Sequence, residues 1–217
     1  NKIPFLKKYK VIYYGFSTKE FKSSKNIENV FLKLKQKYKI NKRDIILSNI
    51  ARHVKQKSID VLLKAFAIYS KDKKNVKLIL VGKGPETNNL KKLSKILNVS
   101  KNICWIKNYE NVKDIFLLSD VFVLPSEYEG LGLVLLEAMS SKTPIISSNT
   151  SAIPEIIKNN YNGYLFTKGD YKKLAYKLKL IENNKIKNNF KKNGINFLIK
   201  KFNLNTMHQL TMDSYNS

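Results

Sequence analysis

The chain has 217 residues, 43% of them hydrophobic, and a formal net charge of +25 from 41 basic and 16 acidic side chains. This composition supports one substantial buried core and argues against a disordered chain. There is no fixed-period repeat and no apolar stretch near 18 residues, so a solenoid and a membrane-spanning bundle have no support in the sequence.

The first half of the chain alternates short apolar runs with amphipathic ones. Residues 1–10 have the character of a linker that leads into the segment 10–15, and we expect the folded domain to begin there. Ile45–Ala51 predicts a strand, and a polar loop with Arg52 and Lys57 separates it from an amphipathic helix predicted over Ser58–Tyr69. Arg52 is noteworthy because Arg43 is the only other arginine.

Two further strands are predicted over Val76–Val81 and Ile103–Ile106. The first runs into Gly82-Lys83-Gly84-Pro85, a glycine-rich turn of the kind that often only shapes a strand-to-helix connection. The second is followed by Lys107 and Asn108.

The segment 120–140 is the most informative part of the chain. An apolar strand over 120–124 leads into a polar turn with Glu129, Gly130 and Gly132, and then into a helix predicted to be buried nearly all round. Glycines at such a turn let a ligand approach the backbone, and the free amides of a helix start suit a phosphate. Glu137 is expected two turns into this helix and is anomalous, because an unpaired carboxylate in an apolar helix is costly. It is either a ligand-binding group or the partner of a lysine such as Lys142.

Apolar segments at 143–147, 153–157 and 162–166 continue the alternation, which predicts an α/β fold with a mostly parallel, Rossmann-like sheet. Ligands of such sheets bind at the carboxyl ends of the strands. The residues that directly follow predicted strands should therefore gather at one edge; they are Arg52, Gly84, Asn108, Ser126 and Glu129.

The pattern Pro-Ser-x-x-Glu-Gly-x-Gly-Leu-x-x-x-Glu-Ala-Met over 125–139 resembles the signature of retaining glycosyltransferases of family 4, or group 1. The strand followed by Arg-x4-Lys, the Val-Gly-x-Gly-Pro turn and the later segments agree with it, so the resemblance covers roughly residues 11–180. It implies the second, nucleotide-sugar-binding domain of the two-domain GT-B fold. The sequence departs from the family's glycines at Ala51, Ser58 and Lys107, and His53 replaces a usual apolar residue.

The resemblance also implies roles for individual residues. Arg52 and Lys57 would bind the donor diphosphate, and Glu129 would bind sugar hydroxyls as a positioning group rather than a covalent one; these three are the expected catalytic residues. Glu137 would bind the ribose. The other expected donor-binding residues are Gly130, Leu131, Gly132, Leu133, Val134, Gly84, Lys107 and Asn108. No metal and no cofactor are expected, because no Asp-x-Asp is present and the donor is itself the substrate.

These expectations define a domain over residues 11–182, followed by a lysine-rich helical segment over residues 183–217. The donor is expected to be a nucleotide-sugar, with UDP the favoured nucleotide. The acceptor, a glycan or a lipid-linked glycan, would bind a preceding domain, and without it the chain should transfer no sugar. A cytoplasmic location, peripheral on the inner membrane face, fits such an enzyme. The rival functions are a nucleotide-sugar epimerase, for which acid and base groups are missing, and a nucleic-acid-binding module.

The basic charge admits three interpretations. Nucleic-acid binding is disfavoured because all but two of the basic residues are lysines, whereas base and bidentate phosphate contacts favour arginine. An anionic membrane surface is an alternative partner for stretches such as residues 185–201. The third interpretation is that the lysines form a solvated charged face and that their excess reflects an AT-rich coding sequence, with no function. Cys104 is expected in the core, and His53 and His208 are too few for a metal site. His53 is open to three interpretations: a donor contact, a structural residue or a solvent-facing loop residue.

Overall fold

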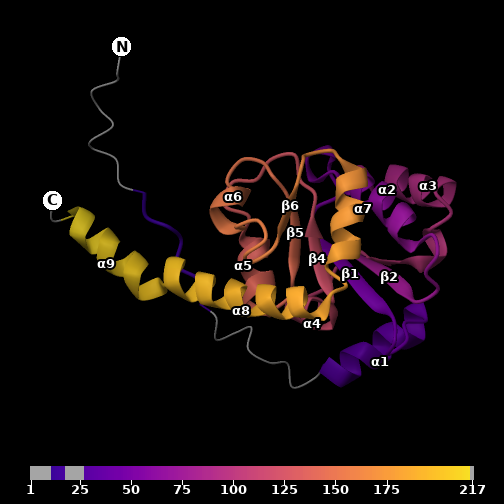
Figure 1. The fold of residues 1–217 in the computed structure, drawn as a ribbon, viewed down its shortest axis with the longest axis horizontal. Coiled ribbons are helices and arrows are strands. Elements are labelled where there is room, and N and C mark those ends of the chain that lie inside the picture. The colour runs from indigo at the N-terminus through magenta and orange to yellow at the C-terminus, as the bar shows by residue number, and fades with distance from the viewer. Residues whose placement is uncertain (1–10, 18–26, 216–217) are drawn as a thin grey trace, which may run out of the picture.

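The computed structural model describes residues 11–17 and 27–215, and its core is a three-layer α/β sandwich (Figure 1). Six parallel strands form one sheet in the order β3-β2-β1-β4-β5-β6. The strands are β1 (Ile45–Ile50), β2 (Val76–Val81), β3 (Ile103–Ile106), β4 (Val121–Leu124), β5 (Ile145–Ser148) and β6 (Tyr164–Phe166). The predicted fold class is confirmed.

Strand order places a topological switch point at the centre of the sheet. From β1 the chain first builds outward through β2 to β3, and then returns to place β4 on the other side of β1. The loops after β1 and β4 therefore leave the sheet side by side but lead to helices on opposite faces. Such a switch point is where open α/β sheets bind ligands.

Helices cover both faces of the sheet because the strands are apolar on both sides (Figure 1). On one face α2, α3 and α7 enclose a core with Leu62, Phe66 and Leu178. On the other, α5, α6 and α8 pack around Leu136 and Ile156, and α1 and α4 complete that layer. The helices are α1 (Ile27–Tyr38), α2 (Ile59–Ser70), α3 (Thr87–Ile96), α4 (Val112–Leu118), α5 (Leu133–Ser140), α6 (Ile153–Ile156), α7 (Tyr171–Leu180), α8 (Asn184–Lys201) and α9 (Leu204–Tyr215), with short 3-10 turns η3 (Lys55–Lys57) and η4 (Ser100–Asn102).

Two details of the predicted helix after Gly132 are wrong. The helix α5 begins at Leu133, so Glu137 lies just over one turn from its start rather than two. Leu133 is 45% exposed, and Val134 and Glu137 are only partly buried, so the first turn of α5 is open on one side. The open side is the side on which a ligand can approach.

Ser58, Ala51 and Lys107 replace glycines of the family, and they differ in the backbone strain that a side chain causes there. Ser58 has a left-handed backbone, with φ of 44° and ψ of 42°, at the junction of η3 and α2. A side chain costs energy in that conformation, which explains why glycine suits this position. Ala51 and Lys107 have no positive φ, and other residues therefore fit there without backbone strain.

The segment after residue 182 contains α8 and α9. Helix α8 packs on α5, whereas α9 buries no residue and extends away from the sheet (Figure 1). The irregular segment 11–17 packs against the junction of α8 and α9. The Phe16 amide donates to Phe202 O at 2.8 Å, and the ring of Tyr13 meets that of Phe202 edge-on. The predicted linker, residues 1–10, lies outside the described residues.

Within residues 11–17 and 27–215, no helix combines the length and the hydropathy needed to cross a bilayer.

Candidate functional site

A cavity of about 870 Å³ lies at the carboxyl edge of the sheet, over the ends of β1, β2 and β3. Three loops and the first turns of α3 form it. The residues that line it are Arg52, His53, Gly82, Lys83, Gly84, Thr87, Asn88, Lys91, Trp105, Ile106, Lys107 and Asn108. Four of the expected donor-site residues, Arg52, Gly84, Lys107 and Asn108, thus share one cavity.

The charged residues in this lining are all cations: Arg52, Lys83, Lys91 and Lys107. No carboxylate lines the cavity among the residues that the structure describes. A volume of this size suits a nucleotide-sized ligand, and the charge favours an anionic one.

Two close backbone crossings shape the loops around the cavity. Gly82 has φ of 134°, and a Cβ there would lie 2.0 Å from the carbonyl oxygen of Ala51. A Cβ on Gly84 would lie 2.3 Å from that of His53. The two loops are also joined by hydrogen bonds, from the His53 amide to Lys83 O and from the Glu86 amide to His53 O. Glycine is therefore required at both positions by the protein itself.

An ion pair joins the loop after β1 to the loop after β4. Lys57 Nζ lies 2.6 Å from Glu129 Oε1, and the Ser126 hydroxyl donates to the same oxygen at 2.6 Å. Both charged side chains are largely buried, with 21% and 9% of their surfaces exposed. The Glu127 amide donates to Gln56 O, and the Gln56 side chain donates to Tyr128 O. These contacts place the expected diphosphate cation beside the expected sugar-binding carboxylate.

The start of α5 presents free backbone amides next to this pair. Gly132 caps the helix in the left-handed conformation, with φ of 66°, and the first amide to reach a carbonyl is that of Leu135, which donates to Gly132 O. The amides of Leu133 and Val134 precede it and have no acceptor within the helix. A Cβ on Gly130 would meet no atom of the described residues within 4 Å, so open space lies in front of this turn.

Glu137 has no ion-pair or hydrogen-bond partner for its carboxylate among the described residues. The alternative prediction, a bridge to Lys142, is therefore wrong. Burial raises the pKa of the Glu137 carboxyl above its usual 4.5. A partly buried carboxylate without a partner is costly to the fold, which favours a ligand as its partner.

His53 is 1% exposed, so the solvent-facing interpretation of this residue is wrong. Its Nδ1 lies 2.9 Å from the Thr87 hydroxyl oxygen, and its ring meets that of Trp105 edge-on at 5.8 Å. The Thr87 hydroxyl donates to Gly84 O at 2.8 Å, so the contact with His53 requires a proton on Nδ1. Nε2 is then a bare acceptor, and it has no partner among the described residues.

The folded chain should resist protonation of His53. Burial lowers the pKa of the ring below its usual 6.5, and the Lys91 ammonium lowers it further. The unfolded chain then binds the proton more tightly, so the free energy of unfolding should fall as the pH drops below about 6.5, until the folded ring titrates. Urea melts between about pH 7.5 and about pH 5.5 should show a smaller fall for His53→Leu than for the parent. His208→Leu is the control, because His208 is exposed; an equal fall in all three proteins would contradict the assignment.

The structure brings the expected residues together in two adjacent groups. Arg52, Gly84, Lys107 and Asn108 line the cavity, whereas Lys57, Glu129, Glu137 and residues 130–134 lie beside it, around the loop after β4 and the start of α5. Sequence reasoning did not single out Thr87, Lys91 and Trp105. The four-residue spacing of Thr87 and Lys91, directly after a glycine-rich turn, would have been the signal for the first two.

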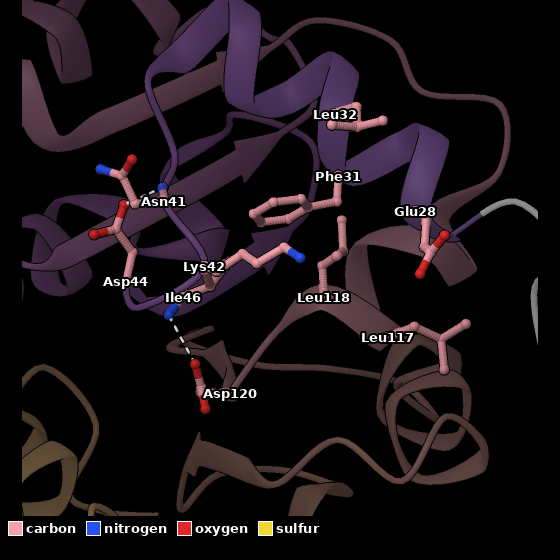
Figure 2. Close-up of a pocket in the computed structure, with 10 residues that line it drawn as sticks. All are labelled: Glu28, Phe31, Leu32, Asn41, Lys42, Asp44, Ile46, Leu117, Leu118 and Asp120. Carbon is pink, nitrogen blue, oxygen red and sulfur yellow. Dashed lines mark hydrogen bonds between the residues drawn. The ribbon is translucent and has the colours of Figure 1, made fainter.

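A second cavity, of about 540 Å³, lies at the opposite, amino edge of the sheet, between α1 and α4 (Figure 2). Asp120 accepts from the Ile46 amide at the start of β1, and Asp44 accepts from the Asn41 amide in the turn before β1, so both carboxylates have structural partners. None of the expected donor-site residues lines this cavity.

Cys104 is buried in β3, as expected, and burial raises the pKa of its thiol to about 12, which makes it unreactive. No group of three or more His, Cys, Asp or Glu side chains within residues 11–17 and 27–215 is arranged to hold a metal ion.

Comparison with known proteins identifies the family. The model of the family "Glycosyl transferases group 1" matches residues 30–197. The capsular polysaccharide biosynthesis glycosyltransferase CapM of Staphylococcus aureus is 28% identical over 188 residues, which cover 85% of this chain and 50% of that protein. The chain spans half or less of the length of the curated relatives that it matches.

Solved structures agree. The C-terminal domain of a group 1 glycosyltransferase (LpcC) of Francisella tularensis superposes with a TM-score of 0.75 at 26% identity, covering 88% of this chain and all of that one. TarM of S. aureus, solved with UDP, fondaparinux and α-GlcNAc-glycerol, superposes with a TM-score of 0.74 at 25% identity, covering 82% of this chain and 37% of that one. The chain belongs to the group 1 glycosyltransferases, and its fold is that of their C-terminal domains.

Proposed function

We propose that this chain is the donor-binding domain of a retaining, metal-independent glycosyltransferase that uses a nucleotide-sugar, with UDP as its nucleotide. The observation that carries the proposal is the meeting of the cationic loop 52–57 with Glu129 and the open start of α5. These groups come from three segments of the chain and converge at the switch point of the sheet.

The diphosphate is the part of the donor that this site fits best. Arg52 is exposed at the cavity, and Lys57, five residues further along the same loop, pairs with Glu129. The free amides of Leu133 and Val134 follow Glu129 at the start of α5. Departure of the nucleoside diphosphate builds negative charge on its β-phosphate. Fixed cations and amides stabilise that charge more in the transition state than in the ground state.

Glu129 has one oxygen engaged and one available. Oε1 receives both Lys57 and Ser126, and Oε2 has no hydrogen-bond partner among the described residues. A carboxylate held in this way can accept hydrogen bonds from sugar hydroxyls without moving. In the retaining reaction we propose, the acceptor attacks from the face that the diphosphate leaves, so Glu129 positions the sugar and forms no covalent bond. Glu137 would accept hydrogen bonds from the ribose hydroxyls.

The proposal extends to the partners of the whole enzyme. TarM was solved with UDP, and CapM is named for capsular polysaccharide biosynthesis, which supports a UDP-sugar and a cell-surface glycan. We propose a glycan or lipid-linked acceptor bound by a second domain, a cytoplasmic location peripheral to an anionic membrane, and no nucleic-acid partner.

Glu137→Gln tests this function directly. The change keeps the shape of the side chain and removes a charge that lacks a partner, so the thermal midpoint without ligand should stay the same or rise. UDP affinity should fall about tenfold, since a charged acceptor to the ribose becomes a neutral one. Melting curves and titration calorimetry with UDP would measure both.

Glu28→Gln is a suitable control, because Glu28 is exposed on α1 at the opposite edge of the sheet. A Glu137→Gln protein that melts earlier and binds UDP as tightly as the parent would refute the ribose-binding role.

A further inference from the structure

Trp105 is the only tryptophan of the chain, and it lines the cation-rich cavity. It is the third residue of β3, which is an edge strand of the sheet. Its neighbours Cys104 and Ile106 pack into the core under α1 and α4. Trp105 therefore points to the other face of the sheet, toward α3, where it is only partly buried.

Two side chains from different elements lie against the indole. His53 meets it edge-on, with ring planes at 78°, and is itself fixed by Thr87. Lys91 of α3 places its ammonium 5.8 Å from the centre of the indole ring. Lys91 is exposed, so its flexible side chain can move away from the ring without disturbing the core.

An indole that is partly open inside a cavity lined by four cations combines the two features that a nucleotide requires. The cations suit its phosphates, and a flat aromatic surface suits its base, because every base has a π-face that can stack. Arg52, an expected phosphate ligand, lines the same cavity as Trp105. One ligand that fills the cavity can therefore reach both.

We propose that Trp105 is the surface on which the heteroaromatic base of the donor nucleotide stacks, with the buried ring of His53 holding the indole in place. The inference rests on the proposed function and adds to it a residue that determines affinity for the base. In the bound state the base takes the position of the Lys91 ammonium over the ring. The Lys91 charge is then free to interact with the phosphates.

The experiment compares UDP with inorganic pyrophosphate, which carries the phosphates and no base. Trp105→Leu should lower UDP affinity by about tenfold or more and leave pyrophosphate affinity within about twofold of the parent. Trp105→Phe keeps an aromatic face and should retain most of the UDP affinity. Unchanged UDP affinity in Trp105→Leu, or an equal loss for both ligands, would overturn the inference.

The parent protein provides a second test that does not depend on a variant that folds. Because Trp105 is the only tryptophan, its fluorescence reports on this cavity alone. Saturating UDP should shield the indole from quenching by acrylamide, whereas pyrophosphate should not. UDP that binds without shielding Trp105 would contradict the inference.

The same titrations separate this inference from the proposed function. If Arg52→Ala leaves pyrophosphate affinity unchanged, the phosphate site is wrong, whatever Trp105 does. If Arg52→Ala weakens pyrophosphate binding but Trp105→Leu spares UDP, only the base platform fails.

Discussion

Arg52→Ala and Lys57→Ala should each lower UDP affinity by about tenfold or more, but only Lys57→Ala should also destabilise the empty fold. Charge-assisted hydrogen bonds to phosphate contribute roughly 1.5–3 kcal/mol each, which explains the loss of affinity. The sequence alone, which shows no partner for either residue, predicts little loss of stability for either change. The structure distinguishes them, because Lys57 is paired with Glu129 whereas Arg52 has no ion-pair partner among the described residues.

Removing Lys57 leaves a carboxylate that is 9% exposed with Ser126 as its remaining donor. Breaking one side of a largely buried pair should cost about 1–3 kcal/mol of the free energy of unfolding. Titration calorimetry with UDP and urea melts would measure the two effects. Arg43→Ala and Lys64→Ala are matched controls: Arg43 is exposed before β1, and Lys64 belongs to an exposed pair with Asp60.

If Arg52→Ala and Lys57→Ala bind UDP as Arg43→Ala does, the loop 52–57 is an ordinary charged surface. If Lys57→Ala is as stable as Lys64→Ala, the pair with Glu129 contributes nothing to the fold, and only the ligand-binding role is left.

Gly84→Ala should destabilise the fold and Gly130→Ala should not, although both glycines belong to the expected donor site. A Cβ on Gly84 would lie 2.3 Å from the His53 carbonyl oxygen, so the two loops must separate, at a cost of about 1–3 kcal/mol or more. A Cβ on Gly130 meets no atom of the described residues within 4 Å, and its φ is not positive. Gly130→Ala should therefore change stability by less than about 0.5 kcal/mol.

The new methyl group of Gly130→Ala would occupy space that the ligand needs. UDP-sugar affinity should fall about tenfold in a protein that melts like the parent. Gly169→Ala is a less suitable control, since its φ of 78° strains any side chain. Exposed Ser214→Ala on α9 serves better, because α9 buries no residue. Parental affinity in Gly130→Ala would show that no ligand approaches this turn.

The architecture could be predicted from the sequence because its signals are local. Runs such as Val76–Val81 and Ile103–Ile106 are continuous and apolar, as strands covered on both faces must be, and both coincide with β2 and β3. Arg52 and Lys57 lie in one loop, and the glycines and carboxylates of 127–137 lie in one turn and the start of the helix that follows it. A resemblance to a family can be read from such short segments.

The exposure of the first turn of α5 could not be predicted from its sequence. Apolar residues on nearly every side of α5 predict a helix that is buried nearly all round. Hydrophobicity alone does not show that its first turn lies at the edge of the sheet, where Leu133 is left 45% exposed.

Contacts between distant segments were decided only by the tertiary structure. Lys57 and Glu129 are 72 residues apart, and their pairing depends on β4 lying beside β1. His53 is buried because Gly84, Thr87 and Trp105, which are more than 30 residues away in the chain, pack against it. Local periodicity specifies strands and helices, but it carries no information on which loops meet. Strand order decides which loops meet, and it therefore brings the four cations and the single tryptophan together around one cavity.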